Sequence, residues 1–162
     1  MTSYECFQGA AKIESLAKEM YAGLAEKFAG RPYLRHLFAQ LSAEEEQHAM
    51  RIWLLARHQG KAPWTADAME RLSGTLGVMA AEIESMKAEF AMQDSAIDPG
   101  EIMRRVVDLE RRFGAIHAQE LARCADPEVQ KLFSGLAQQD ARHLALIESA
   151  RTKGEPSAPG RG

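Results

Sequence analysis

The stretch AEEEQHA at residues 43–49 carries an acid and a histidine inside a regular helical pattern. Apolar residues recur around it at helical spacing, at Leu34, Phe38, Leu41, Ile52 and Leu55. Residues three and four positions apart share one face of a helix, so Glu45 and His48 are expected to point the same way as this apolar stripe. The stretch therefore predicts a helix whose core-facing side carries two potential metal ligands.

A second stretch, QQDARH at residues 138–143, repeats this arrangement on another apolar stripe. Its acid and histidine follow those of the first stretch by 95 residues, and an upstream acid, Glu110, follows Glu14 by 96 residues. Such self-similarity predicts an internal duplication. A single E-x-x-H pair is weak evidence for a metal, but its repetition predicts one site with six ligands, namely Glu14, Glu45, His48, Glu110, Asp140 and His143.

The composition favours helix almost throughout, because Ala, Leu, Glu, Lys, Arg, Gln and Met dominate and β-branched residues are few. Residues that stop or cap helices divide the chain, and they are Gly30 with Pro32, Gly60 with Pro63, Asp98 to Gly100, and Asp126 with Pro127. These breakers predict long helices at 3–29, 32–59, 99–125 and 127–151.

Residues 62–98 connect the second of these helices to the third. Their apolar residues also recur at helical spacing, and Gly74 and Gly77 lie within the pattern, so the connector is expected to hold one helix or two. Short links within each half and a long link between the halves predict two helical hairpins joined by a crossover. The predicted fold is therefore an all-α four-helix bundle with a long, partly helical crossover.

The chain has the size of one domain, which we expect at residues 1–152, and its Gly-, Pro- and Ser-rich end predicts a disordered tail at 153–162. A formal net charge of -3 gives no sign of a nucleic-acid or membrane partner. No signal segment or long apolar run is evident, so a cytoplasmic protein is expected. The two cysteines form no C-x-x-C pair, which leaves carboxylates and imidazoles as the ligands for a metal.

Charge also favours a metal site over an ordinary core. Four carboxylates are expected in one core layer, and burying each of them without compensation would cost several kcal/mol. No Lys or Arg occupies the four apolar stripes. Two divalent cations would offset the four negative charges while His48 and His143 stay neutral and act as ligands.

These motifs resemble those of the rubrerythrin-like members of the ferritin-like superfamily. The resemblance covers roughly residues 5 to 150 and includes E-x6-Y at Glu14 and Tyr21 and E-x6-H at Glu110 and His117, beside the two stretches above. It implies a di-iron site, although manganese or zinc would also suit these ligands. It further implies that Glu45 and Asp140 bridge the metals, that Glu14 and Glu110 are mainly terminal, and that each histidine binds one metal.

Three departures from the family pattern bear on function. Asp140 is one methylene shorter than the usual Glu, and His117 stands where the first half has Tyr21. Two roles are open for His117, an imidazole hydrogen-bonded to Glu110 or a seventh ligand, whereas Tyr21 is expected to bond Glu14. The cysteine-rich module of full-length rubrerythrins is not seen, so a separate electron donor is expected.

The resemblance implies an oxidoreductase that reduces hydrogen peroxide or dioxygen. Iron handling as a ferroxidase, and a metal-binding bundle without catalysis, are the alternatives. A homodimer is expected because the Met-rich stripe of the connector exceeds what one bundle flank needs. Glu44, Glu46, His36 and His58 fall beside the stripes or near a helix end, and are expected at the surface. For Glu44 and Glu46, which flank Glu45, a supporting contact to the ligands is the alternative.

Overall fold

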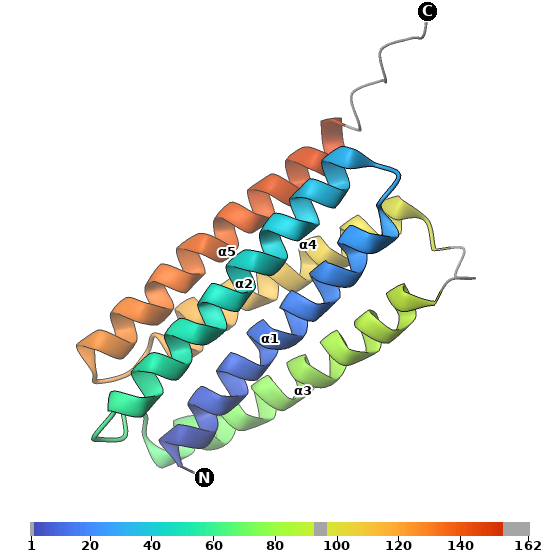
Figure 1. The fold of residues 1–162 in the computed structure, drawn as a ribbon. Helices are drawn as coiled ribbons and strands as arrows, with labels where there is room; N and C mark the ends of the chain where they lie inside the picture. The colour runs from blue at the N-terminus through green and yellow to red at the C-terminus, as the bar shows by residue number, and fades with distance from the viewer. Residues whose placement is uncertain (1, 93–96, 154–162) are drawn as a thin grey trace, which may run out of the picture.

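The computed structural model describes residues 2–92 and 97–153, and within that part of the chain every regular element is a helix (Figure 1). The elements are α1 (Ser3–Lys27), α2 (Pro32–His58), α3 (Ala66–Ala91), α4 (Pro99–Ala115), the π-helix η1 (Ile116–Leu121) and α5 (Pro127–Lys153). The predicted all-α fold is confirmed. Of the tail predicted at 153–162, only Lys153 is described, as the last residue of α5, and the rest lies outside the described residues.

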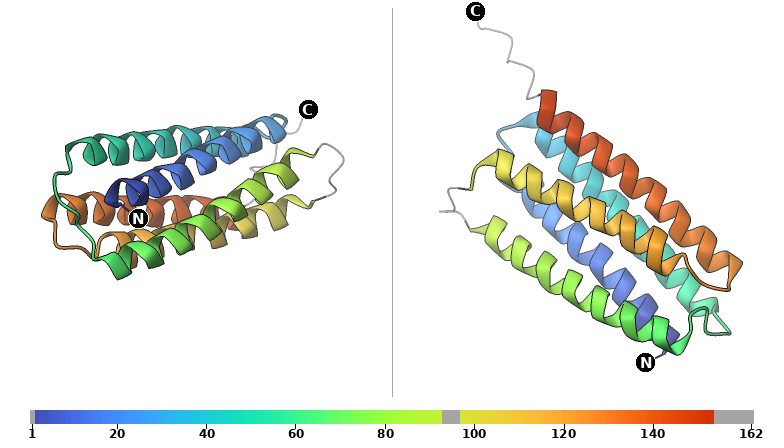
Figure 2. Two further views of the ribbon diagram at one scale, coloured as in Figure 1. Left: turned by 90° about the horizontal axis from the view of Figure 1, so that it is seen from below. Right: turned by 180° about the vertical axis from the view of Figure 1, so that it is seen from behind.

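The helices form two antiparallel hairpins that face each other. α1 pairs with α2, α4 and η1 pair with α5, and α2 packs against α5 across the bundle. α3 runs along the side of α1 and carries the chain back to the end of the bundle where α4 begins (Figures 1 and 2). This arrangement is the predicted ferritin-like four-helix bundle, and its crossover contains one helix that Gly74 and Gly77 do not end.

The predicted breakers lie where the helices begin. Pro32, Pro99 and Pro127 are each the first residue of a helix, where a proline leaves no intrahelical hydrogen bond unmade. Asp126 Oδ1 accepts hydrogen bonds from the amides of Glu128 and Val129, at 2.9 and 3.1 Å, and so caps α5. The predicted ends of the four bundle helices therefore agree with the observed ends to within two residues, except at the C-terminal end of the third helix.

The third long helix differs from its predicted range of 99–125. α4 ends at Ala115, and the chain continues as a π-helix whose Ala122 amide donates to the His117 carbonyl at 2.9 Å. The indole of Trp64, in the link before α3, donates to the Leu121 carbonyl at 3.1 Å and satisfies one of the carbonyls at the end of this segment. π-helices are rare and often lie at functional sites, and this one contains His117.

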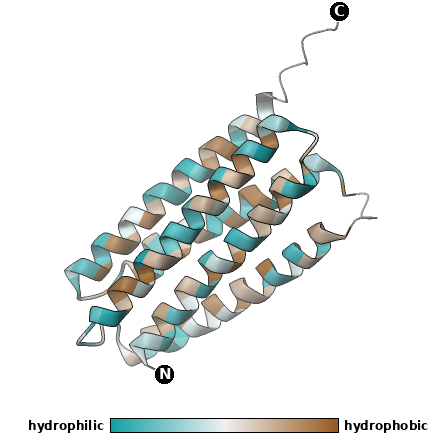
Figure 3. Cartoon of the chain, viewed as in Figure 1, coloured by the Kyte–Doolittle hydropathy of each residue, from teal (hydrophilic) through white to brown (hydrophobic). Residues whose placement is uncertain are grey.

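The Met-rich stripe of α3 is buried within the chain itself. Leu72, Met79, Ile83 and Met86 are at most 3% exposed and belong to the same hydrophobic core as the bundle helices. Figure 3 shows hydrophobic and hydrophilic residues alternating along the helices, as amphipathic helices require. The stripe therefore gives no reason to expect a homodimer, and the homodimer stays a prediction.

None of the helices described here is long and apolar enough to cross a lipid bilayer.

Candidate metal centre

The six predicted ligands and His117 lie in one buried layer of the bundle. Each side chain is at most 1% exposed, and together they make up all the fully buried carboxylates and imidazoles of residues 2–92 and 97–153. Every bundle helix contributes: Glu14 from α1, Glu45 and His48 from α2, Glu110 from α4, His117 from η1, and Asp140 and His143 from α5. Because each lies on an apolar stripe, packing of the stripes forces the seven groups together.

Two sets of three donor atoms stand out within this layer. One set is Glu14, Glu45 and His48, the other is Glu45, Glu110 and His143, and in each the ligand atoms lie within 4.8 Å of one another. In the first set, His48 Nδ1 lies 2.8 Å from Glu45 Oε2 and 3.4 Å from Glu14 Oε2. In the second, His143 Nδ1 lies 3.1 Å from Glu45 Oε1 and 3.6 Å from Glu110 Oε2. Glu45 therefore turns one oxygen to each set.

Several atoms of the layer are buried without a hydrogen bond. They are both oxygens of Glu14, Glu45 Oε1, Glu110 Oε2, Asp140 Oδ1, His117 Nε2 and His143 Nδ1. A buried polar atom with no partner costs about 1 to 3 kcal/mol, and more when the group is charged. Cations bound among these atoms would satisfy them, and oxygen and imidazole nitrogen are suitable ligands. The groups could thus hold metal ions.

Without a metal, the three imidazoles carry part of the compensating charge. Burial opposes the charged forms, but Glu14 and Glu45 outweigh it for His48 and raise its pKa to about 10. Asp140 and Glu14 likewise raise the pKa of His117 to about 10, against the effect of burial. For His143, Glu110 and Glu45 overcome burial and raise the pKa to about 11. Metal binding at neutral pH must therefore displace protons.

The carboxylates of the layer are unequal in the metal-free protein. Burial would raise the pKa of Glu14, but the neighbouring Glu45, His117 and His48 side chains lower it to about 2. Burial raises the pKa of Glu110 to about 7, because the attraction of His143 only partly offsets it and Glu45 adds repulsion. Burial and the neighbouring Glu14 also raise the pKa of Glu45. Glu110 and Glu45 therefore hold a proton more readily than free carboxyl groups, whereas Glu14 does so less readily.

Tyr21 bonds the opposite half of the bundle. Its hydroxyl donates to Glu110 Oε1, so the prediction that it bonds Glu14 on its own helix is wrong. Glu14 lies two turns away on the same face of α1, whereas the Tyr21 ring points across the bundle and stacks on Phe38 at 5.9 Å. Burial and the nearby Glu110 raise the pKa of Tyr21, which keeps the phenol protonated.

His117 contacts the same layer, but through different partners from the one expected. Its Nδ1 lies 2.6 Å from Asp140 Oδ2 and its Nε2 lies 2.9 Å from Glu14 Oε1, so the predicted bond to Glu110 is wrong. The π-helix changes the direction of the side chain relative to a regular α-helix, and the ring stacks at 5.8 Å from Phe133. Tyr21 thus bonds an acid of the other half, whereas His117 contacts one acid of each half.

Asp140 lies in the buried layer but in neither donor set. His117 occupies its Oδ2, and only its Oδ1 is without a hydrogen bond. Glu45 is the one residue that the two donor sets share. A bridging role for Asp140 therefore stays a prediction.

Two residues just outside the layer contact its histidines; the sequence left such a contact open for Glu44 and did not indicate Gln139. Glu44 Oε2 lies 2.8 Å from His143 Nε2, and Gln139 Oε1 contacts His48 Nε2. Glu44 was expected at the surface and is in fact 23% exposed. The signal in the sequence is the repeat itself, since Gln139 follows Glu44 by the same 95 residues that separate the histidines.

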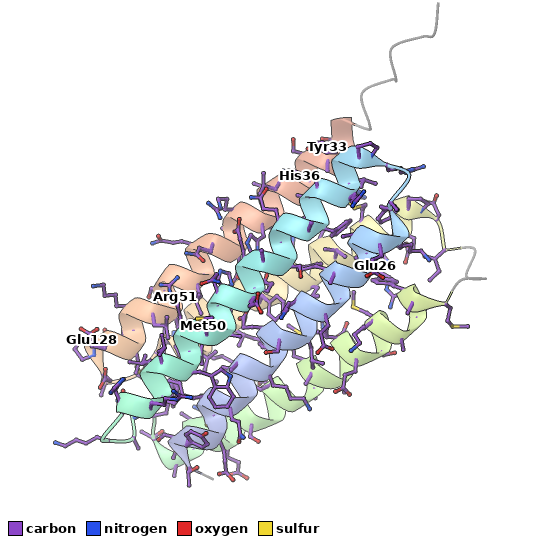
Figure 4. The ribbon with its side chains drawn as sticks, viewed as in Figure 1. Glu26, Tyr33, His36, Met50, Arg51 and Glu128 are labelled. Carbon is purple, nitrogen blue, oxygen red and sulfur yellow. The ribbon has the colours of Figure 1, made fainter. Side chains whose placement is uncertain are left out.

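The other polar residues set aside by the sequence are exposed as expected. Glu46 is exposed and pairs with Lys18 at 2.7 Å. His36 and His58 are exposed near the two ends of α2, and Figure 4 labels His36 close to the first turn of the helix.

The family model described as Rubrerythrin matches residues 5–97, more than half of the 162-residue chain. Comparisons with curated proteins and with solved structures found no match. The matched range holds Glu14, Tyr21, Glu45 and His48, while the second hairpin lies beyond it, where the contacts above place Glu110 and His143 beside the first half. On the strength of the matched range and the bundle, the chain belongs to the rubrerythrin family.

Proposed function

We propose that the protein binds two iron ions and uses them to reduce hydrogen peroxide or dioxygen. The observation that carries the proposal is the pair of buried donor sets that share Glu45, each with two carboxylates and one imidazole. Two divalent ions would offset the four carboxylates of the layer and would satisfy its unbonded atoms. Membership of the rubrerythrin family supports iron as the metal.

The chain's own residues would hold the ions and control protons. Glu14 and Glu110 would each bind from one side, and Glu45 would bind from between them, one oxygen to each set. The protonated hydroxyl of Tyr21 donates a hydrogen bond to Glu110 Oε1, which leaves Glu110 Oε2 free to bind a metal ion. His117 orients Asp140 in the same way, by occupying Oδ2 and leaving Oδ1 free.

Two ferrous ions in these sets would supply the two electrons that, with two protons, convert hydrogen peroxide into two water molecules. The seven buried side chains exclude bulk water from the reacting atoms. His117, which contacts Asp140 and Glu14, could give and regain a proton beside the centre, whereas Tyr21 holds its proton. The electrons that restore the ferrous state would come from a separate donor protein.

The test is rapid mixing of the anaerobically reduced, iron-loaded protein with each oxidant in turn. We expect the bound iron to be oxidised at least tenfold faster than free ferrous iron by one of the two oxidants, because the site holds both ions where one oxidant molecule can meet them. Oxidation no faster than that of free ferrous iron, with both ions bound, would show a metal-binding bundle without catalysis.

His117→Tyr tests whether that imidazole is a metal ligand. The variant should keep two metal ions per chain, because neither donor set contains His117, and it should change mainly the rate of oxidation. Elemental analysis of the loaded variant measures the ions, and stopped-flow absorption measures the rate. Loss of one ion per chain would instead make His117 a ligand and the two halves of the site chemically different.

A further inference from the structure

Each histidine of the donor sets contacts a residue of the opposite helix through Nε2, the ring nitrogen that faces away from the layer. His143 Nδ1 faces the layer while its Nε2 lies 2.8 Å from Glu44 of α2. His48 Nδ1 also faces the layer while its Nε2 contacts the amide oxygen of Gln139 on α5. The rings lie nearly parallel, with centroids 5.5 Å apart and 13° between their planes. The contacts thus cross between α2 and α5 in both directions.

The two supporting residues occupy equivalent positions in the repeat. Glu44 immediately precedes Glu45, and Gln139 immediately precedes Asp140. Their side chains are close to isosteric, since they differ only by an oxygen in place of an amide nitrogen. Their charges differ, however, and Glu44 also accepts hydrogen bonds from Arg142 and from Gln40, the latter at 2.9 Å. Glu44 is therefore a carboxylate, and Gln139 is its neutral counterpart.

This difference acts on the histidines as ligands. An imidazole that binds a metal through Nδ1 keeps its proton on Nε2 and donates it to the group behind. A carboxylate acceptor gives a charge-assisted hydrogen bond, which is stronger than one to an amide and makes the imidazole a more basic ligand. His143 has the carboxylate acceptor and His48 has the amide.

We propose that Glu44 and Gln139 are positioning residues that make the two metal sites unequal, so that Glu45, Glu110 and His143 hold their ion more tightly than Glu14, Glu45 and His48 hold theirs. The inference rests on the proposed function only in requiring that the chain binds two ions. Each set has one imidazole, one carboxylate of its own and one oxygen of Glu45, while Tyr21 bonds Glu110 and His117 contacts Glu14. The sets also differ in the acceptor that faces each imidazole from outside the layer, and a single substitution, at Glu44 or at Gln139, removes this difference.

The experiment is a cobalt(II) titration of the metal-free protein, followed by visible absorption, with a competing chelator to measure both dissociation constants. The wild type should bind two ions with separate constants. Glu44→Gln should weaken the tighter constant by about 10- to 100-fold, the range typical of losing such a partner, and should shift the absorption of the first cobalt ion bound. Gln139→Glu should strengthen the weaker constant by a similar factor.

Glu46→Gln is the matched control. It removes the same charge two residues further along α2, but Glu46 is exposed and contacts Lys18 instead of a histidine. Both constants should stay at their wild-type values in this variant. Far-UV circular dichroism of each metal-free variant checks that the bundle is intact.

The outcomes separate this inference from the proposed function. The positioning role would be overturned if Glu44→Gln kept both cobalt dissociation constants at their wild-type values, or if Glu46→Gln weakened binding as much as Glu44→Gln. Either result would leave the two-ion site in place. A wild-type protein that binds no cobalt, zinc or iron would overturn the proposed function and this inference together.

Discussion

Glu45→Ala is expected to abolish binding of at least one metal ion per chain. Glu45 is the only residue that belongs to both donor sets, with Oε2 towards His48 and Oε1 towards His143. Removing a direct ligand should weaken binding by more than the roughly 10- to 100-fold typical of an outer partner. Elemental analysis after anaerobic loading measures the remaining ions.

The control for this substitution is Glu46→Ala, one residue further along α2. Glu46 is exposed and should be replaceable without loss of metal. The metal-free Glu45→Ala protein should stay folded, because the change removes one of four crowded buried acids and alanine favours helix. If Glu45→Ala bound two ions with near-wild-type affinity, Glu45 would not be a ligand shared by the two ions.

Metal binding should stabilise the protein more as the pH rises from about 5 to 9. In the metal-free protein, His48, His117 and His143 have folded-state pKa values of about 10, 10 and 11, above the ordinary value of 6.5. A raised pKa contributes stability that is complete below pH 6.5 and is lost as the pH rises towards the folded-state value. The metal-free bundle should therefore become less stable with rising pH.

Glu110 strengthens this trend at the acid end. Because its pKa is raised from 4.5 to about 7, the folded state binds the proton more tightly, and the resulting stability is lost between those two values. Metal ligation has the opposite dependence, since it requires His48 and His143 to lose a proton and is favoured at higher pH.

The measurement is the melting temperature with and without two equivalents of zinc at pH 5.5, 7 and 8.5. Ligand at about 1,000 times its dissociation constant adds about 4 kcal/mol. For a chain of this size that corresponds to a rise in melting temperature on the order of 10 °C, which we expect at pH 8.5 and not at pH 5.5. If the rise in melting temperature caused by zinc stayed constant or became smaller with rising pH, the assignment of His48 and His143 as metal ligands would be contradicted.

The sequence determined the fold closely because its signals are local. Pro32, Pro99 and Pro127 begin helices at the predicted residues, and the apolar stripes face the core as helical spacing requires. The repeat, of 95 or 96 residues, also predicted that all six candidate ligands share one layer, where the structure places them. Each of these features depends on spacing along a helix, which the sequence states directly.

The contacts across the bundle could not be read in the same way. Helical spacing shows that Tyr21 and His117 face inward, but it does not show which acid each one meets on another helix. The π-helix at Ile116–Leu121 has no sequence marker comparable to a proline, and it redirects His117 towards Asp140. Glu44 lies beside its stripe and was therefore expected at the surface, but its side chain reaches His143 on a neighbouring helix.

The central claim is that one buried layer binds two metal ions that share Glu45. The most direct test is the metal content of the wild-type protein, measured by elemental analysis after anaerobic loading with ferrous iron and removal of free metal. We predict two iron ions per chain. One ion per chain, or none, would contradict the account.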